Sequence, residues 1–386
     1  MSKIMEIIDA AKSVGVEPQK TEKMLETVKP FLELISMADV RITPLDWLWH
    51  GWIASGKLHI IGGAPGTGKT TIAMSVAATI SRGGQWPDRT YAPVGKVIIW
   101  SGEDDPGDTL APRLLAMGAD MENVQFISRV FTGVMKSAFD PARDVDILGE
   151  RISTIPNIRL IVIDPIVSAI IGDSHRNGEV RRGLQPLADL ASEFNAALIG
   201  ITHFAKGTQG REAGERIIGS IGFTAAARIV MVAAKDKSAG AESDRRVFAR
   251  AKNNVGLENG GFIYTVEQRM LAEYPGIAAS YVNWGEAIDG SACEILARAE
   301  AIADNGEESQ SALMEAMDFL RDILAAGAVE VKEVKRMAGN ICIADITLRR
   351  AKAALSIMTR REGFGKTGKF TWELPIENFK ADENFV

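Results

Sequence analysis

The sequence has few cysteines, no long apolar run and no leader pattern, and each absence excludes a class of protein. Its two cysteines, Cys293 and Cys342, lie far apart without metal-ligand spacing, so we expect neither a disulfide framework nor a cysteine metal site. No apolar run reaches the ~18–20 residues of a membrane-spanning helix. The opening residues MSKIMEIIDAAKSVG mix acids with helically spaced apolar residues, unlike a cleavable signal peptide. We therefore expect a cytoplasmic protein without a membrane partner.

Neither sign of charge dominates the chain. Its 44 Lys and Arg residues and 50 Asp and Glu residues give a net charge of −6. This balance argues against a protein that binds nucleic acid over its whole surface, but it is compatible with a local basic patch. With 386 residues, 46% of them hydrophobic, the chain is long enough for a large core and one or two smaller domains.

A glycine-rich loop lies between an apolar run and an alanine-rich stretch in KLHIIGGAPGTGKTTIAMSVAATIS, residues 57–81. It satisfies the Walker A pattern GxxxxGK[ST] in the strand–loop–helix context that the motif requires. Glycines let backbone N–H groups surround phosphates at a helix N-terminus. We expect Lys69 to reach the β- and γ-phosphates of ATP and the Thr70 hydroxyl to bind Mg²⁺. The predicted nucleotide-binding residues are Gly63, Ala64, Pro65, Gly66, Thr67, Gly68, Lys69, Thr70 and Thr71.

Two further apolar runs end in acids. The run LIVID ends at Asp164, the Walker B position, where a carboxylate holds Mg²⁺ through water. Pro165 follows, so the common Asp-Glu pair with a water-activating glutamate is absent. The run IIWSGEDD, residues 98–105, offers Glu103 instead, at the end of a strand that we expect beside the Walker A strand. We predict that Glu103 polarises the attacking water and that Asp104 and Asp105 form a turn and N-cap for a helix over 107–117.

The order of these motifs resembles that of the RecA/DnaB-type ATPases, and more closely that of the RepA-like hexameric replicative helicases of plasmids, phages and integrated elements. The resemblance covers residues 40–285 and includes PLDWLWHGWIASGKL, EDDPGDTLAPRLLAMGAD and LIGITHFAKG. It implies an α/β fold with a RecA-like P-loop core and a central, mostly parallel sheet. It also implies Mg-ATP hydrolysis between the subunits of a homo-hexamer, with single-stranded DNA in the ring centre.

The resemblance implies roles for residues after the Walker B strand. His203 ends the run LIGIT, where the family senses the γ-phosphate, although a lone histidine is often structural. The glycine- and charge-rich segment 206–220 stands where the family has a DNA loop of the central channel, with Lys206 and Arg211 as its candidate contacts. A plain surface loop is the alternative for this segment.

A ring ATPase also needs cations that one subunit supplies to the nucleotide of its neighbour. RRVFARAKNNVG, residues 245–256, matches the family's Lys-x-Arg-Asn-Gly stretch at Lys252, but Asn254 stands at the arginine position. Arg250 and Arg228 are the substitutes that we consider for this arginine finger. Either residue could instead pair with a carboxylate at the edge of the sheet.

We divide the chain into four segments: a helical segment 1–40, the ATPase domain 41–290, a helix and polar linker 291–311, and a winged helix-turn-helix domain with a tail, 312–386. The N-terminal segment could cap the core or pack on a neighbouring subunit. The last segment has the pattern helix, helix, helix and two short strands around a glycine turn. Candidate phosphate contacts on its third helix and wing are Arg349, Arg350, Lys352, Arg360, Arg361, Lys366 and Lys369. Many winged helices bind protein instead, so both partners stay open.

The function that these patterns favour is an ATP-driven, ring-forming DNA helicase or translocase for replication of a plasmid, phage or integrated element. The alternative is an ATP-switched DNA-binding regulator or helicase loader that does not unwind DNA. A recombinase of the RecA kind is a third option, which the absence of an obvious polymerisation segment disfavours.

Overall fold

The computed structural model describes residue 32, residues 34–362 except 175, 204–220, 241, 301–307, 326, 342 and 344, and residues 369–375. The chain forms two compact units, residues 1–44 and 45–386. In the first unit, the described residues 32 and 34–44 contain turns but no helix or strand, and most of the helical segment expected over 1–40 lies outside the described residues.

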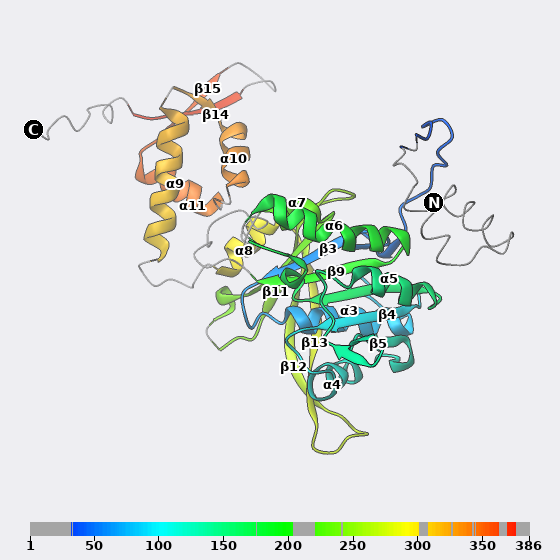
Figure 1. Cartoon of the computed structure of the whole chain (residues 1–386). Helices are drawn as coiled ribbons and strands as arrows, with labels where there is room; N and C mark the ends of the chain where they lie inside the picture. Colours follow the sequence, from blue (N-terminus) through cyan, green and yellow to red (C-terminus); the bar gives the residue numbers. More distant parts are fainter. Residues whose placement is uncertain are drawn as a thin grey trace, which may run out of the picture. The chain divides into compact units, whose positions relative to one another are not determined.

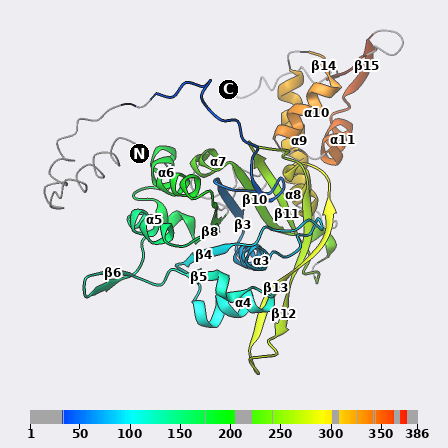
Figure 2. The same cartoon turned by 90° about the vertical axis from the view of Figure 1, so that its right-hand side faces the viewer.

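A nine-stranded sheet forms the centre of the second unit, in the order β13-β12-β11-β10-β3-β9-β8-β4-β5. Neighbouring strands from β10 to β5 pair in parallel, and β10 to β13 pair antiparallel (Figures 1 and 2). This mixed architecture confirms the coarser part of the predicted fold class, an α/β fold with a central, mostly parallel sheet. The strands are β3 (Leu58–Gly63), β4 (Lys96–Ser101), β5 (Val124–Phe126), β8 (Ile158–Asp164), β9 (Ala197–His203), β10 (Ile229–Lys235), β11 (Arg246–Asn253), β12 (Gly261–Met270) and β13 (Ala278–Ile288).

The predicted position of the strand before Glu103 is wrong. That strand, β4, does not pair with β3, because β8 and β9 lie between them. Strand order depends on how the helical crossovers return the chain to the sheet, and periodicity within a strand does not contain that information.

Helices cover both faces of the sheet, because the parallel strands are apolar on both sides. In β8, Ile161 and Ile163 pack on one face with α5, α6 and α8, while Leu160 and Val162 pack on the other with α3 and α4. The helices are α3 (Lys69–Arg82), α4 (Ala111–Ala116), α5 (Val145–Ser153), α6 (Asn177–Glu193), α7 (Ile221–Ala226) and α8 (Ala292–Glu300). Single turns of helix are η1 (Pro106–Leu110), η2 (Met121–Asn123), η3 (Ile166–Ala169) and η4 (Lys237–Ala239).

Two small hairpins accompany the sheet. The β6–β7 hairpin (Val130–Thr132, Met135–Ser137) stands out from it (Figure 2). The β1–β2 hairpin (Trp47–Trp49, Ile53–Ala54) supplies tryptophans to a buried aromatic cluster, in which Trp49 stacks on Trp86 with ring centroids 4.8 Å apart. Trp284 from β13 meets Trp49 edge-on at 6.1 Å, so the cluster joins the hairpin to the antiparallel end of the sheet.

The segment expected as helix and linker, 291–311, begins with α8, which packs into the core through Ala292, Ile295 and Leu296. Cys293 on this helix is disulfide-bonded, contrary to the expectation of no disulfide. The other cysteine of the sequence, Cys342, lies outside the described residues. The next helix, α9 (Glu308–Leu324), already begins inside the polar stretch 303–311.

The C-terminal part has a hydrophobic core of its own, which includes Leu320, Val334, Leu348 and Trp372. After α9 come β14 (Val329–Glu330), α10 (Val331–Asn340), α11 (Asp345–Ala354), β15 (Met358–Glu362) and β16 (Lys369–Glu373). The three strands form an antiparallel sheet in the order β14-β16-β15 (Figure 1). Three helices followed by two strands is the order that the sequence predicts, and β14 is additional.

Of the helices in the described residues, none is both long and apolar enough to cross a membrane.

A buried histidine makes the stability of this fold sensitive to acid. His59 on β3 is fully buried, with Nε2 accepting from the Ala54 N–H at 3.0 Å and Nδ1 lying 3.2 Å from the Leu198 carbonyl oxygen. These partners fit the neutral ring, because protonation would place an N–H on Nε2 against the Ala54 N–H. Burial lowers the pKa of His59 to about 4.

We expect this histidine to cost the wild type roughly 3 kcal/mol of unfolding free energy as the pH falls from 6.5 to 4. The sign follows from the lowered pKa: the unfolded ring binds a proton near pH 6.5, and the folded ring does so only near pH 4. In His59→Gln this acid loss should be smaller by that amount, as measured by urea unfolding at several pH values. His50→Gln, at an exposed position, is the control and should keep the wild-type dependence. Equal pH dependences of His59→Gln and wild type would contradict this prediction.

Candidate nucleotide-binding site

The predicted site residues meet at the carboxyl edge of the sheet because the parallel strands end in register. Gly63, which ends β3, pairs with His203, which ends β9. Ser101, which ends β4, pairs with Asp164, which ends β8. The loop after β3, the acid of β8, the histidine of β9 and the acidic turn after β4 therefore share one edge, where open α/β sheets bind ligands.

The loop after β3 has the backbone of a phosphate cradle. Gly66 and Gly68 adopt φ values of +75° and +86°, a left-handed conformation that favours glycine. Gly63 admits no side chain, since a Cβ there would lie 2.4 Å from the Ala233 carbonyl oxygen. The helix α3 starts at Lys69, directly after the loop, so its N-terminal N–H groups and dipole face the cradle.

The side chain of Lys69 folds back onto the carbonyl oxygens of this loop. Its Nζ donates to the carbonyl oxygens of Gly63 and Ala64, both at 3.0 Å, and lies 3.2 Å from Nδ1 of His203. Burial lowers the pKa of Lys69 to about 8, against the attraction of Asp164 and Glu103. Burial and the neighbouring Lys69 also lower the pKa of His203, which favours a neutral ring that accepts from the ammonium.

Thr70 and Asp164 form a pair of oxygen donors. The Thr70 hydroxyl donates to Oδ2 of Asp164 at 2.7 Å, and Asp164 is only 3% exposed. Burial, ahead of the repulsion from Glu103 and Asp104, raises the pKa of Asp164 to about 6. A hydroxyl and a carboxylate are ligand types that suit Mg²⁺, so these residues fit the ion. Within the described part of the chain, no group of three or more His, Cys, Asp or Glu residues is placed to hold a metal ion.

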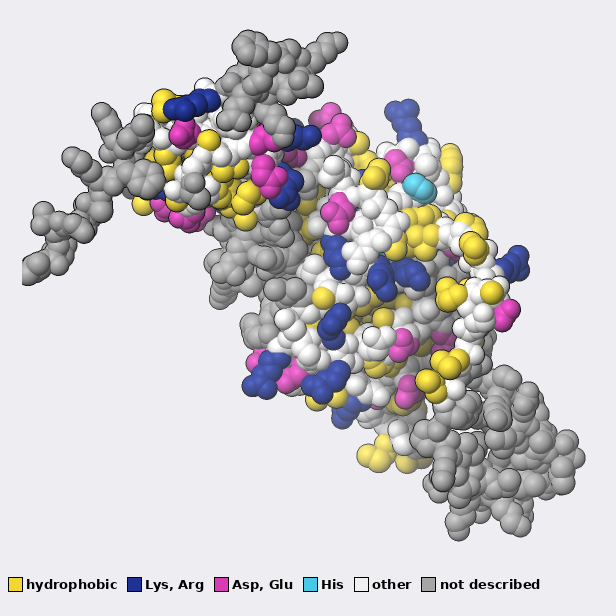
Figure 3. All heavy atoms as spheres, turned by 90° about the horizontal axis from the view of Figure 1, so that it is seen from above, with side chains coloured by type: hydrophobic (Ala, Val, Ile, Leu, Met, Phe, Trp, Pro, Cys, Tyr) yellow, Lys and Arg dark blue, Asp and Glu magenta, His cyan; other side chains and the backbone are white. Residues whose placement is uncertain are grey.

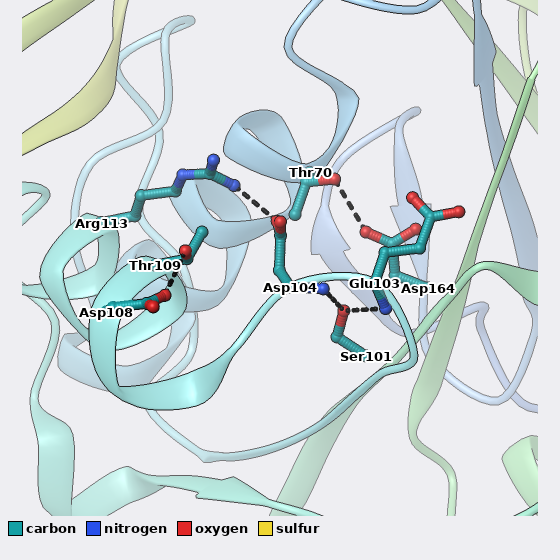
Figure 4. A network of polar contacts seen from close by, with 8 residues as sticks. All are labelled: Thr70, Ser101, Glu103, Asp104, Asp108, Thr109, Arg113 and Asp164. Carbon is teal, nitrogen blue, oxygen red and sulfur yellow. Dashed lines mark hydrogen bonds and ion pairs between the residues drawn. The ribbon is translucent and has the colours of Figure 1, made fainter.

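The three acids after β4 differ in what they contact (Figure 4). Asp105 is the N-cap predicted for the following helix: its carboxylate accepts from the N–H groups of Gly107 at 2.7 Å and Asp108 at 3.1 Å. Asp104 pairs with Arg113, from Oδ2 to Nη1, at 2.8 Å. The carboxylate of Glu103 is exposed, makes no hydrogen bond or ion pair with any described residue, and lies beside Asp164. Glu103 is therefore the acid of this turn that is left for a ligand.

A residue that the sequence did not single out supports the loop from the antiparallel strands. The hydroxyl of Tyr264 on β12, fully buried, donates to the Thr67 carbonyl oxygen at 2.5 Å. Next to it, a Cβ built on Gly68 would lie 2.8 Å from Val266. The one available signal was that a tyrosine in an apolar strand needs a partner for its hydroxyl when buried, and this signal does not identify the partner.

Comparison with known proteins finds a similarity over the part of the chain that contains the glycine loop, Asp164 and His203. Residues 24–209 match the family model of an AAA domain. The DNA repair protein RadA of Helicobacter pylori (strain J99 / ATCC 700824) is 24% identical over 213 residues, which are 55% of this chain and 42% of RadA. These similarities support a RecA-like P-loop ATPase domain in this chain.

The chain spans about two fifths of the length of the RadA relative that it matches, so the likeness concerns the ATPase domain and not the whole of RadA. A solved structure, the crystal structure of the RadB recombinase, aligns with a TM-score of 0.40 and 18% identity. That alignment covers 57% of this chain and 91% of RadB, and a similarity of this degree carries no weight for the function.

The cations considered for a neighbouring nucleotide are partly engaged within the ATPase domain itself. Nζ of Lys252 donates to the carbonyl oxygens of Thr224 at 2.6 Å and Ala227 at 3.0 Å, at the end of α7. The Arg250 guanidinium contacts the carbonyl oxygens of Gly51 and Asn259 and lies 4.6 Å from the centre of the Trp52 ring. Neither residue pairs with a described carboxylate. Their partners are backbone carbonyls and an aromatic ring.

Arg228 differs from these two cations. It is exposed, and its guanidinium makes no hydrogen bond or ion pair with a described residue. Burial, then the nearby charges of Arg228 and Arg181, lower the pKa of Lys252, so these cations lie close together. Figure 3 shows several lysine and arginine side chains on the face of the ATPase domain seen from above. Among the three candidate cations, Arg228 is therefore the one whose guanidinium has no hydrogen bond or ion pair with the residues that the structure describes.

The residues predicted to contact DNA differ in whether the structure describes them and in what their side chains contact. Lys206, Arg211 and Lys366 lie outside the described residues. Arg349 and Arg350 are exposed on α11. Lys352, expected to face DNA, instead donates to the Thr359 hydroxyl at 2.7 Å and lies 5.0 Å from the centre of the Trp372 ring.

The two arginines of β15, Arg360 and Arg361, are further predicted DNA contacts. Arg360 pairs with Glu373 of β16 at 3.0 Å, so its charge is balanced within the C-terminal part. The backbone of Arg361 lies opposite Phe370 in the same hairpin. Arg349 and Arg350, both exposed, stay predicted contacts with phosphates.

We expect Tyr264→Phe to weaken ATP binding about three- to tenfold, because the loop would lose a hydrogen bond whose net contribution is about 0.5–1.5 kcal/mol. The measurement is titration of a fluorescent ATP analogue into the full chain. Tyr281→Phe is a matched control, since the Tyr281 hydroxyl donates to Glu267 on the same hairpin at 2.6 Å and does not contact the loop. Equal affinities of the two variants would show that the Tyr264 hydroxyl does not support the loop.

Proposed function

We propose that the protein is a ring-forming, ATP-driven DNA helicase or translocase that acts in replication of a plasmid, phage or integrated element. The observation that supports turnover best is the carboxylate of Glu103, which has no partner among the described residues and stands beside Asp164 at the mouth of the phosphate cradle. A site that only bound nucleotide would not need a carboxylate there.

Each residue of the site has a distinct task in hydrolysis. The loop N–H groups and Lys69 hold the β- and γ-phosphates, while Thr70 and Asp164 hold Mg²⁺. When bound, Mg²⁺ neutralises part of the phosphate charge. Glu103 accepts a proton from the attacking water, and the neutral ring of His203, next to Lys69, senses the γ-phosphate.

The subunit arrangement and the DNA path are parts of the same proposal. A homo-hexamer would place Arg228, and Lys252 behind it, against the nucleotide of the adjacent subunit. Single-stranded DNA would pass the ring centre near Lys206 and Arg211. The C-terminal part would act as a winged helix that holds duplex DNA through Arg349 and Arg350. The similarity to RadA, a DNA repair protein, supports a role on DNA.

A second function is favoured by a specific observation. Lys252 and Arg250 are engaged within their own subunit, and Asn254 replaces the arginine of the family stretch. A protein without a finger would bind ATP and assemble, yet hydrolyse it slowly. In that case the chain would be an ATP-switched DNA-binding regulator or helicase loader.

Glu103→Gln tests the catalytic assignment. We expect ATP hydrolysis to fall at least ~10²-fold, the scale of a lost general base, while ATP affinity stays within about threefold. Glu150→Gln on α5 is the matched control and should hydrolyse ATP as the wild type does. Near-normal turnover in Glu103→Gln would refute the assignment. Unwinding of a forked duplex by the wild type and not by Glu103→Gln would distinguish a motor from a switch, since a switch unwinds nothing.

Arg349→Ala combined with Arg350→Ala tests the C-terminal part. We expect weaker binding to forked DNA and a salt dependence shallower by about 0.9 in the log–log slope for each phosphate that the variant no longer neutralises. DNA-independent ATP hydrolysis should not change. Arg321→Ala with Arg336→Ala removes the same charge from α9 and α10 and should keep the slope. A slope unchanged by the α11 variant would favour a protein-binding role for this part.

A further inference from the structure

The acidic turn after β4 holds more negative charge than hydrolysis requires. Asp104 follows Glu103 directly, and its charge lies close enough to Asp164 to contribute to the raised pKa of that buried carboxyl. Three carboxylates therefore meet where an anionic nucleotide would bind. The negative charge of Asp104 would repel the phosphates and compete with Asp164 and Glu103 for cations. A nearby positive charge is therefore needed to balance it.

Arg113 balances that charge. Its Nη1 lies 2.8 Å from Oδ2 of Asp104, and the two side chains are only 23% and 28% exposed, so solvent screens the pair less than a surface pair. The arginine comes from α4, and Figure 4 shows the pair on the side of the turn away from Asp164. The carboxylate of Asp104 is thereby paired with Arg113, while that of Glu103 lies beside Asp164.

The turn itself is fixed to β4 at its start. The Ser101 hydroxyl accepts from the N–H groups of Glu103 at 3.3 Å and Asp104 at 2.9 Å. The Gly102 N–H donates to the Asp164 carbonyl oxygen at 2.8 Å. These hydrogen bonds fix the backbone of the turn. They do not involve the side chain of Asp104, so they do not fix its direction.

The end of α4, the helix that carries Arg113, is hydrogen-bonded to other elements around the site. This end accepts hydrogen bonds from Arg269 of β12, at the Ala116 carbonyl oxygen, and from Arg82 of α3, at the Gly118 carbonyl oxygen. A five-residue π-helical turn, Pro106–Leu110, joins the acidic turn to α4. Such turns are often found at functional sites. Arg113 thus holds Asp104 from a helix anchored to α3, whose first residues are Lys69 and Thr70.

We propose that Arg113 is a positioning residue for hydrolysis: it neutralises Asp104 and holds it away from the metal and phosphates, which leaves Glu103 free to act on the attacking water. This inference rests on the proposed ATP hydrolysis. Arg113 does not touch the nucleotide. Its contribution is to keep an adjacent carboxylate out of the reacting centre.

Arg113→Gln in the full chain tests the inference. We expect kcat for ATP to fall about tenfold, since small displacements of catalytic groups can cost up to ~10²-fold. The dissociation constant of an ATP analogue should change less than about threefold, because the loop, Lys69 and Thr70 are untouched. Adding Asp104→Asn to Arg113→Gln should restore kcat to within about threefold of the wild type, because the unbalanced charge is gone. A merely structural arginine would not be rescued by loss of its partner's charge.

Control variants distinguish a failure of this inference from a failure of the proposed function. Arg321→Gln breaks an exposed arginine–aspartate pair with Asp318 on α9, far along the chain from the site, and should leave kcat unchanged. If Arg113→Gln does not fold, as seen in its thermal unfolding, Arg113→Lys and the double variant carry the test, and both should keep most of the activity. Wild-type kcat in Arg113→Gln, or no recovery in the double variant, overturns the role of Arg113 and leaves the proposed function intact. A wild type that does not hydrolyse ATP overturns the proposed function, and this inference with it.

Discussion

A carboxylate buried at the tip of a strand is the constraint on which the rest of the site depends. Asp164 is almost inaccessible at the end of β8, and a charge there needs hydrogen-bond partners. The Thr70 hydroxyl provides one at 2.7 Å and so links the first turn of α3 to β8. The link requires β3, β9 and β8 to end at the same level, which their parallel register secures. The glycine loop, the Thr70–Asp164 pair and the acidic turn meet because of that register.

The sequence predicted those parts of the site that depend on contiguous residues. The glycine loop, Asp164 and His203 were located because each stands at the end of an apolar run, and parallel strands bring such ends together. Asp105 was recognised as a cap because capping is a local interaction. The order of the C-terminal helices and strands was likewise readable from periodicity and turn residues.

What the sequence did not predict depends on contacts between distant segments. The place of β4 in the sheet was wrong because crossover paths are not encoded within a strand. The partner of Tyr264 lies 197 residues away in the chain, and Arg250 looked available until the structure placed Trp52 and two carbonyls against it. Lys352 is a similar case, since a basic residue on an exposed-looking helix packs on Trp372. The pattern of charges in the sequence did not predict these contacts within the fold.

The distribution of tryptophan has a consequence for spectroscopy. The aromatic cluster of the ATPase domain includes Trp284, whose indole N–H donates to the Ser75 hydroxyl on α3, 3.2 Å away, on the helix that begins at the phosphate cradle. The C-terminal core contains Trp372, and no other tryptophan follows Trp284 in the sequence. Replacing Trp372 alone would leave an intrinsic fluorescence that comes only from the part with the nucleotide site. The difference between the two spectra would then report on the C-terminal part, without any added dye.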